Sequence, residues 1–174
     1  KKTKDENGKR VILELNLKTF EYGDRTKAYY DSVGKVKDIE DVKERIPILV
    51  NADDKAGQFY RETFYDMFKY CSFRIPEIAD ELYRIDQAVA AGFAWEIGPF
   101  QTWDVLGLKE TAEKMKELGH APASWVDEMI AAGHDSFYKF ENGKKLYYDI
   151  PSKSYKVVPG TEGLVILDAF KQNN

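Results

Sequence analysis

GFAWEIGPFQTWDVLG, residues 92–107, is the stretch around which the expected fold of this chain is organised. Pro99 follows Gly98 directly, and proline suits the first position of a helix because its φ is already near the helical value and its missing N–H is no loss there. Gly92 and Gly107 lie where helices would end, which favours residues able to adopt positive φ. The stretch therefore predicts the end of one helix, an aromatic turn and the start of another helix.

Two helices are predicted before this turn. Asp53 or Asp54 is a suitable cap for the first, although Gly57 in its first turn costs up to ~1 kcal/mol relative to alanine and is expected to loosen that end. Its apolar residues recur at three- and four-residue spacing, at Ala56, Phe59, Tyr60, Phe64, Met67, Phe68 and Cys71. The second helix is expected to start at Pro76, to present Ile78, Leu82, Ile85 and Val89 on one face, and to end at Gly92.

Two further helices are predicted after the turn. The first spans residues 108–118, with Leu108, Ala112, Met115 and Leu118 on one face and Gly119 as terminator. Ser124 and Asp127 then resemble a capping box for a helix that Gly133 ends.

The two ends of the chain differ from this helical middle. Residues 1–10 are expected to be loose, residues 11–17 alternate in polarity like a strand, residues 21–37 have the composition of a linker, and a short helix over 38–45 is interrupted by Pro47. Near the other end, Asn142-Gly143 between two aromatic runs predicts a hairpin. A third strand is expected over 155–158 and a short closing helix over 163–171. The predicted division is therefore a linker with a short strand and helix (1–47), a helical domain (48–135), and a hairpin with a closing tail (136–174).

Composition excludes several classes of protein. A net charge of −4 and a pI near 5.4 argue against binding to nucleic acid, which depends on clustered lysine and arginine. A single cysteine, Cys71, excludes an internal disulfide and suits a reducing compartment, so we expect a cytoplasmic protein. No apolar run approaches the ~20 residues that a membrane span requires. Eleven tyrosines fit either a partner surface or a well-packed core.

Residues with catalytic chemistry are few. His120 and His134 each follow the end of a predicted helix, where a histidine is favoured by the helix dipole, and no neighbour in the sequence offers a partner for catalysis. Cys71 lies on an apolar helix face and is expected to be buried and inert. Neither a G-x-G-x-x-G motif nor a P-loop is present. We therefore expect no catalytic, cofactor-binding or metal-ligating residue in this chain.

Asp86 and Asp104 lie beside the apolar faces of their helices, where an aspartate needs a buried hydrogen bond. We expect both to accept hydrogen bonds from backbone N–H groups of the turn at residues 98–100. Their predicted role is to lock this turn rather than to react.

Residues 81–107, ELYRIDQAVAAGFAWEIGPFQTWDVLG, resemble the C-terminal helical domain of 3-hydroxyacyl-CoA dehydrogenases. The similarity is strongest over about residues 52–132. The positions that carry it form a structural motif with fixed spacing: Asp86, Gly92, Phe93, Gly98, Pro99, Phe100, Asp104 and Gly107.

This resemblance implies a mainly α fold of the 6-phosphogluconate dehydrogenase C-terminal type, with a small β-hairpin appendage near the C-terminus. The variants Trp95-Glu96 and Trp103 are most similar to bacterial bifunctional enzymes that join the dehydrogenase to an enoyl-CoA hydratase, in which this chain would be the second helical copy. The implied partners are an upstream Rossmann domain that holds NAD, a downstream hydratase domain, the acyl-CoA substrate of the parent enzyme, and a possible second copy in a homodimer.

The role that the resemblance implies is interdomain or dimer packing and closure over acyl-CoA. The catalytic His–Glu pair of the family belongs to the Rossmann domain, and where the first helical copy has an Asn-Arg pair this chain has Asp53 and Asp54. No catalytic residue is therefore transferred to this chain. The alternatives are a purely structural oligomerisation module and a small enzyme with an unrecognised site.

Overall fold

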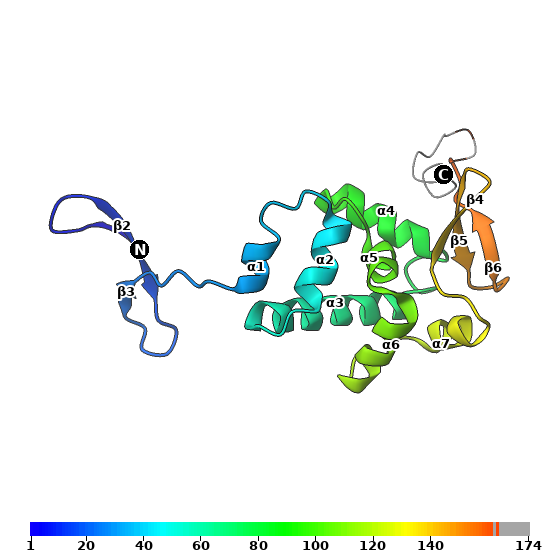
Figure 1. Ribbon diagram of the computed structural model, residues 1–174, viewed down its shortest axis with the longest axis horizontal. Helices are drawn as coiled ribbons and strands as arrows, with labels where there is room; N and C mark the ends of the chain where they lie inside the picture. Colours follow the sequence, from blue (N-terminus) through cyan, green and yellow to red (C-terminus); the bar gives the residue numbers. More distant parts are fainter. Residues whose placement is uncertain (162, 164–174) are drawn as a thin grey trace.

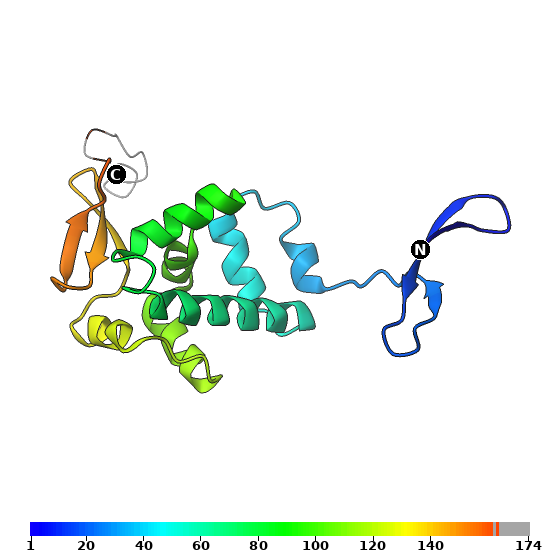
Figure 2. The ribbon, with the colours of Figure 1, turned by 180° about the vertical axis from the view of Figure 1, so that it is seen from behind.

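The computed structural model describes residues 1–161 and residue 163. A helical body carries one small sheet at its C-terminal side, and a second small sheet at the N-terminus is joined to the body by an extended segment (Figures 1 and 2). The described part contains seven helices: α1 (Asp31–Lys35), α2 (Val42–Val50), α3 (Lys55–Phe73), α4 (Leu82–Phe93), α5 (Pro99–Leu106), α6 (Leu108–Glu117) and α7 (Ser124–Ala131).

Both sheets are antiparallel and three-stranded. The N-terminal sheet has the order β1 (Lys2–Lys4), β2 (Arg10–Leu15) and β3 (Tyr22–Asp24), and the second has the order β4 (Tyr138–Glu141), β5 (Lys144–Asp149) and β6 (Ser154–Val157). Asn142 and Gly143 both have positive φ, at 51° and 74°, between β4 and β5. The predicted hairpin and its third strand are therefore confirmed, while the closing helix expected over 163–171 lies outside the described residues apart from residue 163.

The N-terminal sheet corrects two predictions. Residues 1–10 are not loose, because β1 pairs with β2 and Lys2 lies opposite Ile12. The expected linker over 21–37 contains both β3 and α1. Strands of three residues without alternating polarity leave no periodic signal in a sequence, so their pairing appears only when the partner strand is in place.

The helix expected over 38–45 begins later and continues further. Asp41 caps α2 by accepting a hydrogen bond from the backbone N–H of Lys43, and the helix then passes through Pro47 to Val50. A proline inside a helix costs about 3 kcal/mol. Burial of Leu49 and Val50, beyond the proline, offsets this cost and explains why the helix does not stop where the sequence suggested.

The first turn of α3 is fixed rather than loosened by Gly57. Asp54 caps it, with Oδ1 accepting from the Gly57 N–H at 2.9 Å and from the Ser32 hydroxyl at 2.9 Å. A Cβ at Gly57 would lie 2.1 Å from the carbonyl oxygen of Ala52, so glycine is required by close packing. Further along α3 the predicted face is wrong at Phe59, which is 65% exposed, whereas Tyr65 is buried.

Helix α4 starts and ends at residues other than those expected. It begins at Leu82 rather than Pro76, and Ile78, which was predicted to lie on its apolar face, is 67% exposed. It continues past Gly92 to Phe93, and Ala94 adopts the left-handed conformation at φ 54° and ψ 37°. The chain therefore turns two residues after the glycine that the sequence favoured for this role.

The elements that follow agree better with expectation. Pro99 is the first residue of α5, Gly98 is its cap, and Gly107 has φ +85°. Leu118 is exposed instead of buried, which shortens the apolar face of α6. Ser124 is the first residue of α7 and not its cap, because Ala123 holds that position without a side-chain hydrogen bond. The predicted capping box is therefore wrong.

The core is a cluster of aromatic rings gathered from segments distant in sequence. Phe68 of α3 stacks on Trp103 of α5, with ring centroids 5.0 Å apart and an interplanar angle of 11°. Phe137, which directly precedes β4, meets Phe100 edge-to-face at 5.0 Å and Trp103 at 5.2 Å. The C-terminal sheet is thus tied to the helical body through Phe137.

Candidate functional site

Asp86 of α4 fastens the start of α5. Its side chain is buried, with Oδ1 accepting from the Phe100 N–H at 2.8 Å and Oδ2 from the Gln101 N–H at 3.0 Å. These are two of the N–H groups that a helix leaves without an internal partner at its first turn. The hydrogen bond predicted between Asp86 and this turn is therefore present.

Asp104 makes a different connection from the one expected. It does not bond the turn at residues 98–100; its two carboxylate oxygens accept from the N–H groups of Phe137 and Tyr138 at 2.7 and 2.9 Å. The Tyr138 hydroxyl in turn donates to Asp86 Oδ2 at 2.9 Å. Asp86, Asp104 and Tyr138 thus join α4, α5 and β4 into one hydrogen-bonded assembly, which we call the carboxylate assembly.

Burial controls the protonation of the carboxylate assembly. It raises the pKa of Asp86 to about 6 and that of Asp104 to about 8, against the N–H donors, which favour the ionised forms. Burial, followed by the nearby charge of Asp86, raises the pKa of Tyr138 well above its usual value, so this hydroxyl remains a donor. The two carboxyl groups of the assembly bond to backbone N–H groups and to a tyrosine hydroxyl of this same chain, which is the arrangement expected of residues with a structural role.

The structural motif is divided by the fold into a buried part and an exposed part. Gly98, Pro99 and Phe100 are buried, and Gly98 and Phe100 lie against Asp86. Gly92 is exposed, and Phe93 beside it is 74% exposed. The buried part fixes the turn, while the exposed part presents a phenylalanine to solvent.

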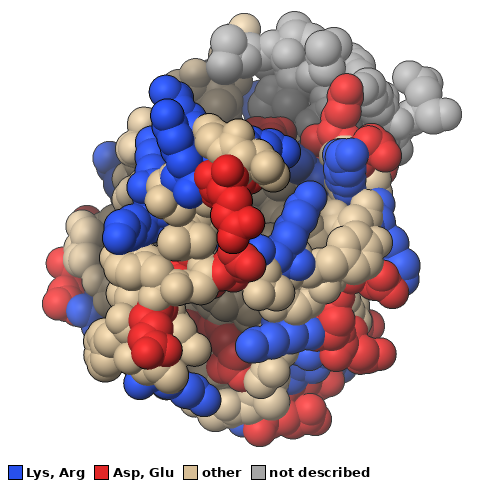
Figure 3. All heavy atoms as spheres, turned by 90° about the vertical axis from the view of Figure 1, so that its left-hand side faces the viewer, with Lys and Arg blue, Asp and Glu red and all other residues tan. Residues whose placement is uncertain are grey.

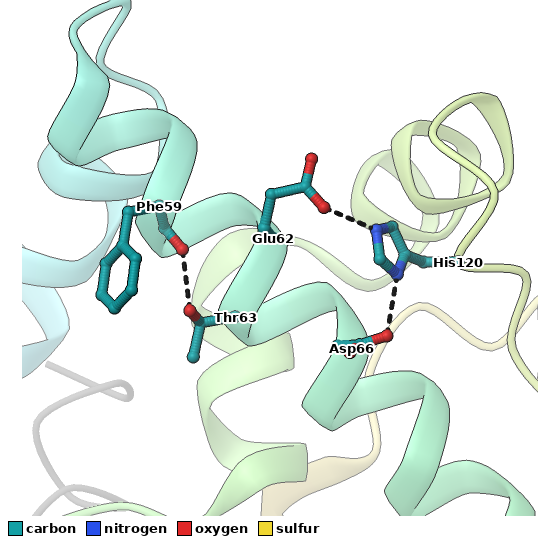
Figure 4. Close-up of polar contacts among 5 residues, drawn as sticks. All are labelled: Phe59, Glu62, Thr63, Asp66 and His120. Carbon is teal, nitrogen blue, oxygen red and sulfur yellow. Dashed lines mark hydrogen bonds and ion pairs between the residues drawn. The ribbon is translucent and has the colours of Figure 1, made fainter. Parts of the chain in front are cut away.

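His120 has partners that the sequence did not reveal. Its Nδ1 lies 3.1 Å from Asp66 Oδ1 and its Nε2 lies 3.0 Å from Glu62 Oε2, as Figure 4 shows. Glu62 and Asp66 are four residues apart on α3 and so project from the same side of that helix. No neighbour in the sequence offered a partner for His120, and its partners in the structure lie 54 and 58 positions earlier in the chain.

The other reactive residue types have structural surroundings. Burial raises the pKa of the Cys71 thiol to about 12, as expected of an inert thiol. The His134 ring contacts the rings of Tyr148 and Tyr155. Among the described residues, no group of three or more histidine, cysteine, aspartate and glutamate side chains is placed to hold a metal ion.

The described part of the chain contains no dinucleotide site of the Rossmann type. A dinucleotide site of the Rossmann type needs parallel strands joined by a helix, with a glycine-rich turn between strand and helix. Both described sheets are antiparallel, and the sequence has no G-x-G-x-x-G.

Two adjoining hollows lie next to the turn between α4 and α5. The larger, of about 1040 Å³, lies between α2, α5 and β4, and its charged lining residues are Asp41, Lys43, Glu96, Asp104, Asp135, Lys139, Glu141 and Lys145. The smaller, of about 310 Å³, is lined by Val42, Ile46, Phe64, Ala94, Trp95, Glu96, Ile97 and Thr102, and we call it the α2–α3 pocket. The two hollows share Val42, Glu96 and Ile97.

Ala94 shapes the outer wall of the α2–α3 pocket. A left-handed backbone costs a residue with a Cβ about 1–2 kcal/mol, and such conformations persist where the surrounding structure enforces them. The turn at Ala94 directs Trp95, Glu96 and Ile97 along the mouth and wall of the pocket. A strained residue therefore borders a concave apolar surface.

Surface charge is mixed in sign. On the face shown in Figure 3, lysine and arginine side chains lie among aspartate and glutamate side chains. Interspersed charges cancel at a distance and do not create the single-sign field that steers highly charged ligands. None of the described helices has both the length and the apolar character needed to cross a membrane.

Comparison with known proteins relates the chain to one group of enzymes. No protein-family model matches it. Over 163 residues, 94% of this chain, the sequence is 36% identical to the "Probable 3-hydroxyacyl-CoA dehydrogenase" of Bacillus subtilis (strain 168). The resemblance to 3-hydroxyacyl-CoA dehydrogenases is confirmed. A second relative, 27% identical over 96 residues, is the "Putative fatty acid oxidation complex trifunctional enzyme" of Rickettsia felis.

Both relatives are much longer than this chain. The chain spans 20% of the length of the Bacillus dehydrogenase and 12% of that of the Rickettsia enzyme. The similarity to the dehydrogenase covers 94% of the chain, so it extends well beyond the motif around residues 92–107.

Proposed function

We propose that the chain is a non-catalytic helical segment of an NAD-dependent 3-hydroxyacyl-CoA dehydrogenase of fatty-acid β-oxidation. The observation that carries this proposal is the 36% identity to a dehydrogenase over 94% of the chain. In the parent enzyme the segment packs between domains or against a second copy and helps to close over acyl-CoA.

A packing role agrees with how the reactive side chains are used. Asp86 and Asp104 accept hydrogen bonds from backbone N–H groups, and both ring nitrogens of His120 face carboxylates. A general base needs a free acceptor within reach of a substrate proton. Neither hollow is lined by His120, which supports a structural role for this histidine.

The finer features of the proposal come from the resemblance. They are a fold of the 6-phosphogluconate dehydrogenase C-terminal type, a helical domain over 48–135 flanked by 1–47 and 136–174, and a position as the second helical copy of a cytoplasmic bifunctional enzyme. NAD would then be held by an upstream Rossmann domain, and an enoyl-CoA hydratase domain would follow. The mixture of helical body and small sheets in the structure is compatible with these features.

The test compares the 174-residue chain with the longer protein that contains it. With NAD and a 3-hydroxyacyl-CoA, we expect NADH formation by the longer protein and none above background by the chain. Turnover by the chain alone would contradict a non-catalytic role. An inactive longer protein that binds neither NAD nor acyl-CoA would contradict the assignment to a dehydrogenase.

A purely structural oligomerisation module is the second candidate. Phe59, Tyr70 and Phe73 on α3 are 65%, 60% and 49% exposed, and they lie within a narrow angular range of the helix surface. Sedimentation of the chain with Phe59→Ser and Tyr70→Ser tests this. If the unmodified chain is a dimer and these substitutions dissociate it, the result supports the oligomerisation module. If the unmodified chain is a monomer at all concentrations, the result contradicts the oligomerisation module.

A further inference from the structure

The two sheets contain the same four-residue segment. Glu6-Asn7-Gly8-Lys9 leads into β2, and Glu141-Asn142-Gly143-Lys144 leads from β4 into β5. When the chain is aligned on this tetrapeptide, several of the residues that follow agree in type: Arg10 with Lys145, Val11 with Leu146, Glu14 with Asp149, Leu15 with Ile150, Lys18 with Lys153, Thr19 with Ser154 and Phe20 with Tyr155. The sequence therefore contains an imperfect internal repeat.

The two repeated segments also fold alike. Each sheet is an antiparallel meander whose middle strand, β2 or β5, follows the tetrapeptide. Gly8 and Gly143 both have positive φ, at 78° and 74°. The turns differ in length, since residues 5–9 separate β1 from β2, whereas residues 142–143 separate β4 from β5. Shared sequence and shared topology identify the two sheets as versions of one unit.

The C-terminal sheet is packed on the helical body. Tyr147 of β5 is buried and meets the Tyr83 ring of α4 edge-to-face, with ring centroids 4.7 Å apart. The rings of Tyr148 and Tyr155 contact the His134 ring, which follows α7, at 5.1 and 5.3 Å. Because successive residues of a strand face opposite sides, both faces of β5 carry aromatic contacts.

The N-terminal sheet has apolar residues at the same positions but stands apart from the helices, at the end of an extended segment (Figures 1 and 2). Ile12 is aligned with Tyr147 and is 55% exposed, and Phe20 is aligned with Tyr155 and is 75% exposed. A small sheet becomes stable by covering an apolar face or by packing against a helix. The N-terminal sheet therefore presents the apolar positions of a docked unit without its docking partner.

One helical body cannot hold both sheets in the same way. The surface at Tyr83 and His134 is already covered by the C-terminal sheet. A second copy of this chain would bring its own C-terminal sheet to the same surface. The partner of the N-terminal sheet is therefore a further helical body, and the Bacillus dehydrogenase has room for one, since this chain spans 20% of its length.

We propose that the N-terminal sheet docks on a second helical body of the kind formed by α3–α7, located before residue 1 in the longer protein. This inference rests on the proposed function, in which the chain is the second helical copy of its parent. The C-terminal sheet follows the helices on which it packs, and the same order places the partner of the N-terminal sheet upstream. Residues 1–4 include no counterpart of the buried Phe137, so the docking depends on Ile12 and Phe20.

Amide hydrogen exchange, read by mass spectrometry on peptides that cover β2 and β5, compares the 174-residue chain with the longer protein. Docking should slow exchange in β2 at least about tenfold in the longer protein, because a docked sheet opens less often. Exchange in β5, which is packed in both proteins, should change by less than about twofold. Equal exchange of β2 in the two proteins overturns the proposal.

A matched pair of variants locates the contact. In the longer protein, Phe20→Ser should return β2 to the exchange rate of the 174-residue chain. Phe93→Ser, at a phenylalanine of similar exposure on α4, should leave it unchanged. Exchange of β2 in the 174-residue Phe20→Ser chain checks that the sheet still forms, and Ile12→Ser replaces this variant if it does not. Slow β2 exchange that persists in a folded variant overturns the proposal.

Photo-crosslinking identifies the partner. With p-benzoylphenylalanine in place of Phe20, the longer protein should form a crosslink to a segment before residue 1 of the same polypeptide. A crosslink to another copy or to a different part of the polypeptide, or no crosslink at all, overturns the proposal. Dehydrogenase turnover is a separate measurement, so normal turnover without slowed exchange of β2 overturns the docking and leaves the proposed function intact.

Discussion

The same substitution at two glycines of the 92–107 stretch should have opposite effects on stability. Gly98 has φ −83°, which any residue adopts, but a Cβ there would lie 2.4 Å from Cα and Cβ of Asp86. A Cβ at Gly92 would meet nothing within 4 Å. Gly98→Ala therefore forces α5 away from α4, while Gly92→Ala adds a methyl group to an exposed helix position.

The size of each effect can be worked out from these contacts. Moving the Gly98 Cβ contact from 2.4 Å to the ordinary 3.4 Å requires a separation of about 1 Å. Overpacking of this kind costs ~1–3 kcal/mol, and weakening the hydrogen bond from Phe100 N–H to the Asp86 carboxylate costs ~1.5–3 kcal/mol more. Gly92→Ala should instead stabilise the helix by roughly 0.5–1 kcal/mol.

Urea denaturation followed by tryptophan fluorescence measures both variants, because Trp103 is fully buried beside the altered turn. We expect unfolding free energies that differ by about 3–7 kcal/mol between the two, equivalent to melting temperatures roughly 6–28 °C apart. A Gly98→Ala protein as stable as the parent would refute the close approach of α4 and α5. A larger loss in Gly92→Ala than in Gly98→Ala would refute the helix boundary.

Three further substitutions test the core, the carboxylate assembly and the histidine contact. Phe100→Ala should lower the free energy of unfolding, measured by urea denaturation, by ~3–5 kcal/mol, because the Phe100 ring is buried in the core. Phe59→Ala, at an exposed position, should change it by less than ~0.5 kcal/mol. Equal losses in the two variants would contradict the position of Phe100 in the core. Burial raises the pKa of Asp104 to about 8 from about 4 in the unfolded chain, so the folded state binds more protons between these values and stability should fall as pH rises from 4 to 8. Asp104→Asn should reduce this fall of stability with pH, measured by thermal melting between pH 4 and 8. A pH dependence identical to that of the unmodified chain would contradict the raised pKa of Asp104. His120→Ala should cost no more than ~1 kcal/mol, because its carboxylate partners are largely exposed, and a larger loss of melting temperature would show a deeper role.

Part of the site could be predicted from the sequence because its signals are local. An aspartate beside an apolar helix face needs a buried partner, which anticipated the bond from Asp86 to the next helix. The partners of Asp104 could not be anticipated, since the N–H groups it binds belong to Phe137 and Tyr138, more than 30 residues later. The contacts of His120 with α3 likewise depend on how two distant segments pack.

What the sequence by itself determined is the set of local elements with strong backbone preferences. Pro99 began a helix, Gly107 ended one, and Asn142-Gly143 made a hairpin, because each residue type restricts or permits particular φ and ψ values wherever it occurs. The spaced motif around the same stretch was also sufficient to indicate the dehydrogenase relatives.

Only the tertiary structure decided where weaker preferences were overridden. Burial beyond Pro47 carried α2 through a proline, and α4 ends at a left-handed Ala94 instead of at Gly92. Each local preference is worth about 1–3 kcal/mol, and burying one or two large side chains supplies as much. The pocket beside Ala94 is lined by residues of three helices and of the turn between α4 and α5, so it cannot be seen in any single stretch of the chain.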